Sequence, residues 1–128
     1  MKWVKVFSVF IVLHIVLWGA AHLYLSTYPT KVLIGVDTSF GLKPQFPAMQ
    51  TWIEDYEASS RYETITIVTD KSEIGPLSEI ASRQSIFRTA FGRSKAEDFQ
   101  DYRSLAADKR VLLSDGSFVI QGWDLTRF

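Results

Sequence analysis

The first pattern in the chain is an apolar run from Val6 to Leu25 that contains no Asp, Glu, Lys or Arg. As an α-helix this run is about 30 Å long, which matches the hydrocarbon core of a bilayer. Lys2 and Lys5 precede the run, so the positive-inside rule places the N-terminus in the cytoplasm and the rest outside. We therefore expect three parts: a transmembrane signal-anchor helix (1–25), a linker (26–31) and an extracytoplasmic domain (32–128).

A cleaved signal peptide is the alternative interpretation of the same run. The charged start and apolar core fit that class, and Gly19-Ala20-Ala21 offers a small-residue cleavage site. However, the apolar pattern continues through His22 to Leu25, which favours an uncleaved, single-pass anchor. Both interpretations export the domain, into the periplasm if the source is a Gram-negative bacterium.

Two histidines, His14 and His22, lie within this run. They are about 80° apart around a helix, so they could share a face and bind haem, a proton or a partner helix. Nothing else in the sequence supports a ligand pair, so we expect His14 to pack in a helix contact and His22 to lie at the interface.

Beyond the linker, strand-like and helix-like patterns alternate. Residues 32–36 predict a buried central strand, and residues 64–70, which are rich in β-branched side chains, predict a second strand. Between them, apolar side chains recur at helical spacing: Phe46, Met49, Trp52, Ile53 and Tyr56. A strand, a helix and a strand in this order predict two parallel strands.

The second half of the domain predicts two helices and two strands. One helix is expected from about Ser78 to Phe91, and the next begins at Ser94-Lys95-Ala96-Glu97, a capping-box pattern. Residues 110–114 form the third predicted strand, and Asp115-Gly116 predicts a hairpin turn. The last strand, within residues 117–123, is therefore expected to return antiparallel at an edge. The fold class is α/β, with a small, mostly parallel sheet of about four strands and three helices.

Oxygen-bearing side chains gather where the three predicted parallel strands end. Asp37, Asp70 and Asp115 each follow an apolar strand, and carboxyl ends of parallel strands share one edge of a sheet. With a strand order of second, first, third, Asp37 lies between the other two. Thr38, Ser39 and Ser94 add further hard oxygen atoms, the kind that Mg²⁺ or Ca²⁺ prefers. Asp and Ser are also common in turns and caps, and spacing alone favours that structural role.

These motifs resemble those of the von Willebrand factor A domain. That family has Asp-x-Ser-x-Ser after its first strand, a Thr in a Gly-containing loop, and an Asp, often in Thr-Asp-Gly, after a later strand. Here Asp37 and Ser39 match the first motif, in which Gly41 replaces the second Ser. Ser94 stands where the Thr belongs, and Asp115 within Ser114-Asp115-Gly116 takes the last role.

The resemblance covers about residues 32 to 118. It implies a reduced, vWA- or Rossmann-like domain that binds proteins, without catalysis. It also implies a weakened site for Mg²⁺ or Ca²⁺ held by Asp37, Ser39, Ser94 and Asp115, with Asp70 nearby.

Composition narrows the function further. The chain has 14 Lys plus Arg and 14 Asp plus Glu, so no net charge favours nucleic acid as a partner. It has no Cys, and both histidines lie in the apolar run, so the domain has no histidine base. We therefore expect no enzyme and no catalytic residue.

A modest basic group, Arg83, Arg88, Arg93 and Lys95, could face anionic lipid or an acidic partner, although a solvated face is favoured. We expect an interaction module that serves as an accessory or assembly subunit of an envelope or membrane complex. Its partners are then the membrane and another membrane or periplasmic protein. The alternatives are a metal-dependent hydrolase that uses the aspartates, and a purely structural membrane subunit.

Overall fold

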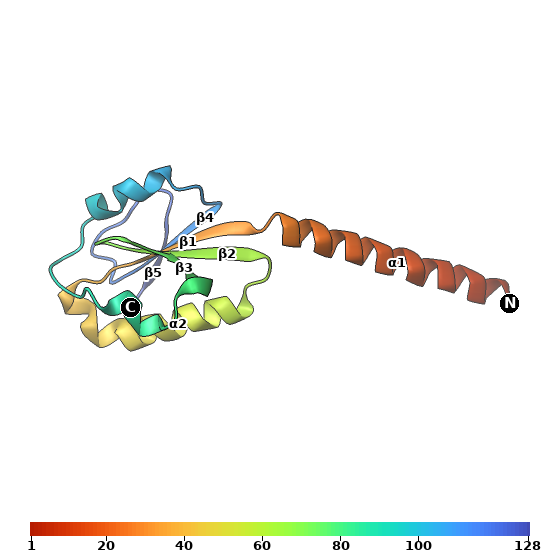
Figure 1. The fold of residues 1–128 in the computed structure, drawn as a ribbon, viewed down its shortest axis with the longest axis horizontal. Coiled ribbons are helices and arrows are strands. Elements are labelled where there is room, and N and C mark those ends of the chain that lie inside the picture. Colours follow the sequence, from red (N-terminus) through yellow and green to blue (C-terminus); the bar gives the residue numbers. More distant parts are fainter.

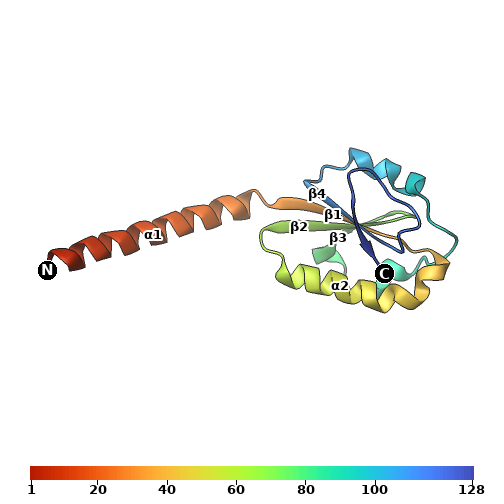
Figure 2. The ribbon, with the colours of Figure 1, turned by 180° about the vertical axis from the view of Figure 1, so that it is seen from behind.

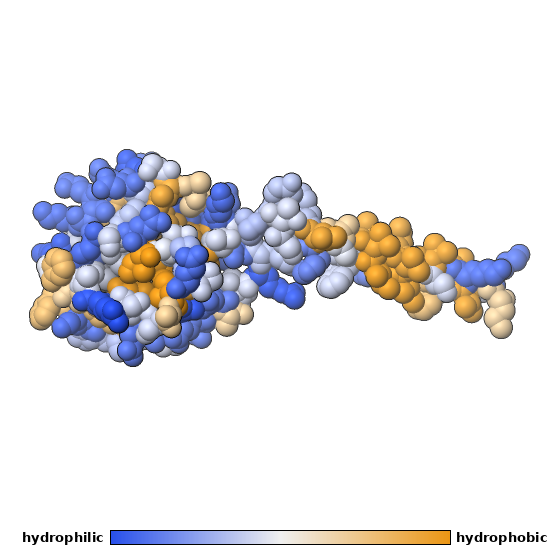
Figure 3. All heavy atoms as spheres, in the orientation of Figure 1, coloured by the Kyte–Doolittle hydropathy of each residue, from blue (hydrophilic) through white to orange (hydrophobic).

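A long helix projects from one end of an α/β domain (Figure 1), in a computed structural model that describes all 128 residues. This helix, α1 (Lys2–Thr27), has no buried residue and is long and apolar enough to span a membrane, although a signal sequence also fits. Apolar residues cover most of its length (Figure 3). Such a surface is unfavourable in water, so α1 requires a bilayer or another apolar cover.

The two histidines of α1 lie in different surroundings. The His14 ring stacks on Phe10, with centroids 6.1 Å apart. The His22 ring stacks on Trp18, and its Nδ1 lies 2.5 Å from the Tyr62 hydroxyl of the domain. His22 therefore contacts the start of the domain.

Five strands form one sheet in the order β3-β2-β1-β4-β5. Their bounds are β1 (Thr30–Val36), β2 (Glu63–Thr69), β3 (Glu73–Pro76), β4 (Lys109–Ser114) and β5 (Asp124–Arg127). β1 pairs in parallel with both β2 and β4, whereas β3 is antiparallel to β2. The predicted parallel strands and their order, with the first between the second and the third, are confirmed.

Two apolar layers cover the sheet (Figure 1, Figure 2). On one face lies α2 (Phe46–Ser59), whose Met49 and Ile53 are fully buried, as the helical spacing predicted. The other face is covered by Phe99 and Trp123. A Cβ at Gly35 would lie 2.7 Å from the Trp123 ring, so the central strand needs glycine there.

The prediction of a helix from Ser78 to Phe91 is wrong. After the edge strand β3, the chain instead forms two short 3₁₀ segments, η2 (Leu77–Glu79) and η3 (Arg83–Phe87). The Arg83 guanidinium donates to the Leu77 and Ile80 carbonyls at 3.2 and 2.8 Å. It therefore satisfies carbonyl groups that a continuous helix would pair internally.

The helix predicted to begin at Ser94 is a 3₁₀ segment, η4 (Ala96–Ser104), which precedes β4. Another 3₁₀ segment, η1 (Phe40–Gln45), leads into α2. The capping residue of η4 is Lys95, whose N–H donates to the Asp98 carboxylate at 2.8 Å. Ser94 is not the cap, because its hydroxyl is bonded elsewhere, to Asp37.

The prediction of an antiparallel last strand is also wrong. β5 pairs in parallel with β4, and residues 117–123 are not a strand. Ile120 and Trp123 in that segment are buried against the sheet, so the chain crosses the face before it enters β5. Burial of these two side chains outweighs the local hairpin signal at Asp115-Gly116.

Candidate functional site

The polar residues of the site lie at the end of the sheet farthest from α1. β1 follows α1 after only Tyr28 and Pro29 and runs away from it (Figure 1). β2 and β4 run parallel to β1, so all three strands end at this membrane-distal edge. Asp37 and Asp70 therefore meet at one edge of the sheet, as predicted, and this edge faces away from the apolar helix.

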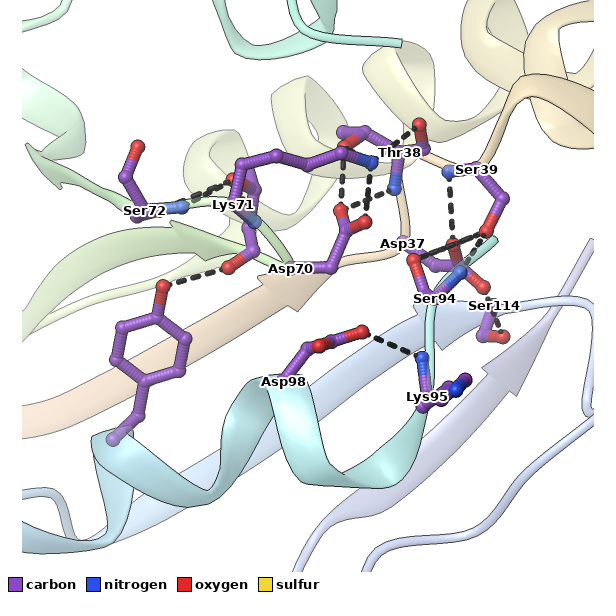
Figure 4. A network of polar contacts seen from close by, with 12 residues as sticks. Asp37, Thr38, Ser39, Asp70, Lys71, Ser72, Ser94, Lys95, Asp98 and Ser114 are labelled. Carbon is purple, nitrogen blue, oxygen red and sulfur yellow. Dashed lines mark hydrogen bonds and ion pairs between the residues drawn. The ribbon is translucent and has the colours of Figure 1, made fainter. Parts of the chain in front are cut away.

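Asp37 is buried among three serines from three separate segments (Figure 4). Its Oδ1 accepts hydrogen bonds from the N–H of Ser39 at 3.0 Å, from the Ser39 hydroxyl, and from the Ser94 hydroxyl at 2.6 Å. Its Oδ2 accepts one from the Ser114 hydroxyl at 2.9 Å. Both carboxylate oxygens are therefore held by neutral donors.

Backbone contacts bring these segments together. The Asp37 N–H donates to the Leu113 carbonyl at 2.9 Å, which extends the pairing of β1 with β4 by one residue. The Phe40 N–H donates to the Gly92 carbonyl at 3.1 Å. Gly92 has φ +67°, which favours glycine, and this turn delivers Ser94 to Asp37.

Asp70 forms a second cluster beside the first (Figure 4). Its Oδ1 accepts hydrogen bonds from the N–H and hydroxyl of Thr38, and its Oδ2 pairs with the Lys71 ammonium. Lys71 Nζ also donates to the Thr38 carbonyl and hydroxyl, each at 3.1 Å. Burial raises the pKa of Asp70, but hydrogen bonds from Lys71, Ser94 and Thr38 outweigh burial and hold that pKa below its usual value.

Asp115 does not join either cluster. It is exposed, and its Oδ1 accepts hydrogen bonds from the Ser117 N–H at 2.9 Å and the Ser114 hydroxyl at 3.3 Å. The bond from the Ser117 backbone is the main cause of its lowered pKa. The residue that reaches Asp37 from the end of β4 is Ser114.

Tyr102 attaches η4 to this edge of the sheet. Its hydroxyl donates to the Thr69 carbonyl at 2.7 Å. Burial, together with the charge of Asp70, raises the pKa of Tyr102 to about 12. The hydroxyl therefore remains a donor throughout the physiological pH range.

Of the five residues predicted as metal ligands, the structure brings three into direct contact: Asp37, Ser39 and Ser94. Asp70 belongs to the adjoining cluster and Asp115 to an exposed turn. No group of three or more His, Cys, Asp or Glu side chains is placed to hold a metal ion. The oxygens at Asp37 are hard ligands of the right kind, but they carry one negative charge.

Thr38, which the sequence placed among the oxygen groups of this edge, contacts Asp70. Sequence reasoning missed two residues of the site, Lys71 and Ser114. Each adjoins a predicted site residue in the sequence, because Lys71 follows Asp70 and Ser114 precedes Asp115. Their proximity to the aspartates was a usable signal. Side-chain direction at the ends of the strands, which decides between neighbours, was not visible in the sequence.

The chain matches no protein-family model, no curated protein sequence and no solved structure. The class that fold and site define is an α/β domain on a long apolar N-terminal helix, with buried carboxylates at the far edge of its sheet. The resemblance to the von Willebrand factor A domain rests on its short motifs.

Proposed function

We propose that the chain is a membrane-anchored, extracytoplasmic protein-interaction module, an accessory or assembly subunit of an envelope or membrane complex. One observation carries this proposal. The exposed apolar helix α1 and the polar edge around Asp37 lie at opposite ends of the molecule (Figure 1). A domain held in this way presents its polar edge to proteins away from its own bilayer.

The proposed anchor is uncleaved and has its N-terminus in the cytoplasm. α1 continues without interruption past Gly19-Ala20-Ala21, and Lys2 and Lys5 lie at its start. Because the chain has no Cys, a Ser117→Cys variant carries one reporter thiol at an exposed position. We expect a membrane-impermeant maleimide to label it from outside, on a chain of full-length mass. Labelling only after lysis, or a mass lower by the first part of α1, contradicts the proposal.

The proposed domain type is a reduced von Willebrand factor A domain. Its support is geometric: Ser94 is far from Asp37 and Ser39 in the sequence, yet the three side chains meet as the motif roles require. A Mg²⁺ or Ca²⁺ ion would be held by these three residues, whose oxygens already converge. With a single carboxylate, we propose weak affinity, in the millimolar range.

Co-purification from native membranes tests the proposed function. The full-length tagged chain is compared with a tagged chain of residues 1–29, which keeps α1 and lacks the sheet. We expect a defined protein to be recovered in stoichiometric amount with the full-length chain only. Equal recovery with the truncated chain would instead indicate a purely structural membrane subunit.

A further inference from the structure

We propose that the membrane-distal end of the domain binds a segment of a partner protein in which acidic and apolar side chains lie together. Phe40, Phe91 and Arg93 form the binding surface, called the distal surface below. This inference rests on the proposed function and specifies the chemistry of the partner.

Two phenylalanines are exposed at this end. Phe40 is 63% and Phe91 is 60% exposed, whereas every other Phe of the domain is buried or half-buried. Their loops adjoin, because the Phe40 N–H donates to the Gly92 carbonyl at 3.1 Å. Figure 3 shows apolar atoms at the end of the domain opposite α1. Paired exposed aromatic side chains are typical of interface anchors.

A lysine lies over each ring. Lys43 Nζ is 5.2 Å from the Phe40 ring centroid, and Lys71 Nζ is 4.7 Å from that of Phe91. The Lys71 ammonium is itself fixed by Asp70 and Thr38. The Phe91 ring therefore lies against a cation whose position is already fixed, which lowers the entropic cost of binding.

The two sequence segments that carry these rings are basic. Residues 38–53 and 80–96 contain no Asp or Glu, although the chain as a whole is neutral. They contain five cations: Lys43, Arg83, Arg88, Arg93 and Lys95. Only Arg83 has an ion pair, with Glu57. Of the four cations without an ion pair, Lys43 lies over the Phe40 ring and Arg93 lines a cavity with Phe91. Unpaired cations beside exposed rings are complementary to carboxylates beside apolar side chains.

A cavity of about 200 Å³ opens beside Phe91, and two cations, Arg93 and Lys71, and two carboxylates, Asp70 and Asp98, also line it. This volume is below that of pockets for drug-sized molecules and suits a single side chain. The cavity therefore fits one side chain of a protein better than a whole small-molecule ligand.

A lipid surface is the other polyanion that cations and aromatic rings attract. The distal surface points away from α1, so it does not face the bilayer that holds the chain. A protein segment is consequently the occupant that the geometry favours.

Peptide selection on the full-length chain in lipid nanodiscs tests this inference. A phage library of random 12-residue peptides is selected on wild type and counter-selected on a Phe40→Ala/Phe91→Ala variant. We expect enriched peptides to combine Asp or Glu with Leu or aromatic residues. Peptides in which Asn and Gln replace Asp and Glu should bind wild type at least ten-fold more weakly. The acidic peptides should also bind the Arg93→Glu variant at least ten-fold more weakly than they bind wild type. Binding should weaken with salt and persist in chelator. A Val119→Ala variant, at another exposed apolar site, should bind as wild type does.

Three results overturn the inference: no enrichment, enriched peptides without acidic residues, or equal binding to the Phe40→Ala/Phe91→Ala variant. Binding to anionic vesicles that the same variant loses would assign the surface to lipid instead. If a partner co-purifies with the full-length chain and also with the double variant, the proposed function stands and this inference fails. A folded double variant, verified by circular dichroism, is the condition for these comparisons.

Discussion

Asp37 and Asp70 end adjacent parallel strands, yet the protein holds their charges in different ways. Asp37 is surrounded by hydroxyl and N–H donors, and no cation contacts it. Asp70 has an ammonium partner in Lys71, in addition to Thr38. Both arrangements replace the water that a carboxylate loses on burial, but only the second also neutralises the charge.

This difference assigns separate roles to the two clusters. The Asp70–Lys71 pair is complete, and it fixes the Lys71 ammonium over Phe91 at the distal surface. The Asp37 cluster joins the ends of β1 and β4 to the loop that carries Ser94. Because four buried donors depend on this one carboxylate, Asp37 is the position at which removal of the carboxylate should cost most.

The largest effect is expected from Asp37→Ala. The change leaves the buried hydroxyls of Ser39, Ser94 and Ser114 without their acceptor, so unfolding free energy should fall by about 4 kcal/mol. Chemical denaturation of the full-length chain in detergent measures this loss. Asp115→Ala, in an exposed turn, is the matched control and should cost less than about 1 kcal/mol. Equal losses would show that Asp37 is not a distinct structural centre.

Lys71→Met should have the next largest effect. It leaves the buried Asp70 carboxylate without a cation, for an expected loss of about 2 kcal/mol at neutral pH, because Lys71 is itself partly exposed. Adding Asp70→Asn should recover most of that loss, which a double-mutant cycle measures. No recovery would mean that Lys71 stabilises the domain by packing on Phe91 alone.

Acid should separate the two aspartates further. The folded-state pKa of Asp70 lies below its usual value, so its contribution to stability is present above about pH 4. That contribution is lost as the pH falls through the lower, folded-state pKa. Between pH 6 and pH 3, the melting temperature should therefore fall more in wild type than in Asp70→Asn. Parallel curves would contradict a lowered pKa.

The smallest effect is expected from divalent cations. A weak site at Asp37 that is half-saturated adds about 0.4 kcal/mol, which corresponds to a rise in melting temperature of about 2 °C. Titration of the full-length chain with Mg²⁺ or Ca²⁺ up to millimolar concentrations measures this shift. Asp37→Asn should abolish it and Asp115→Asn should not. A flat titration of wild type would count against any cation site at this edge.

The sequence predicted those parts of the fold that depend on local patterns. The apolar stretches and their spacing predicted β1, β2, α2 and β4, and the shared edge of Asp37 and Asp70 follows from the parallel strands. The parallel direction of β5 depends on Trp123 packing against Gly35, a contact between distant residues. A local turn signal contains no information about that contact.

The choice between Ser114 and Asp115 shows a second limit of the sequence. Successive side chains at the end of a strand point in opposite directions, so a shift of one residue separates a buried donor from an exposed carboxylate. The motif resemblance favoured Asp115, whereas Ser114 is the residue that contacts Asp37. Short 3₁₀ segments in place of helices are hard to predict for a similar reason, since their apolar spacing resembles that of an α-helix.

Position-specific photo-crosslinking in native membranes tests the central claim, that the end of the domain away from α1 binds a partner protein. A benzophenone side chain is placed at Phe91, in the distal surface, or at Arg61, which is exposed near the start of β1. The account predicts one discrete protein adduct from position 91 and none from position 61. An adduct from position 61 alone, or none from either position, would contradict it.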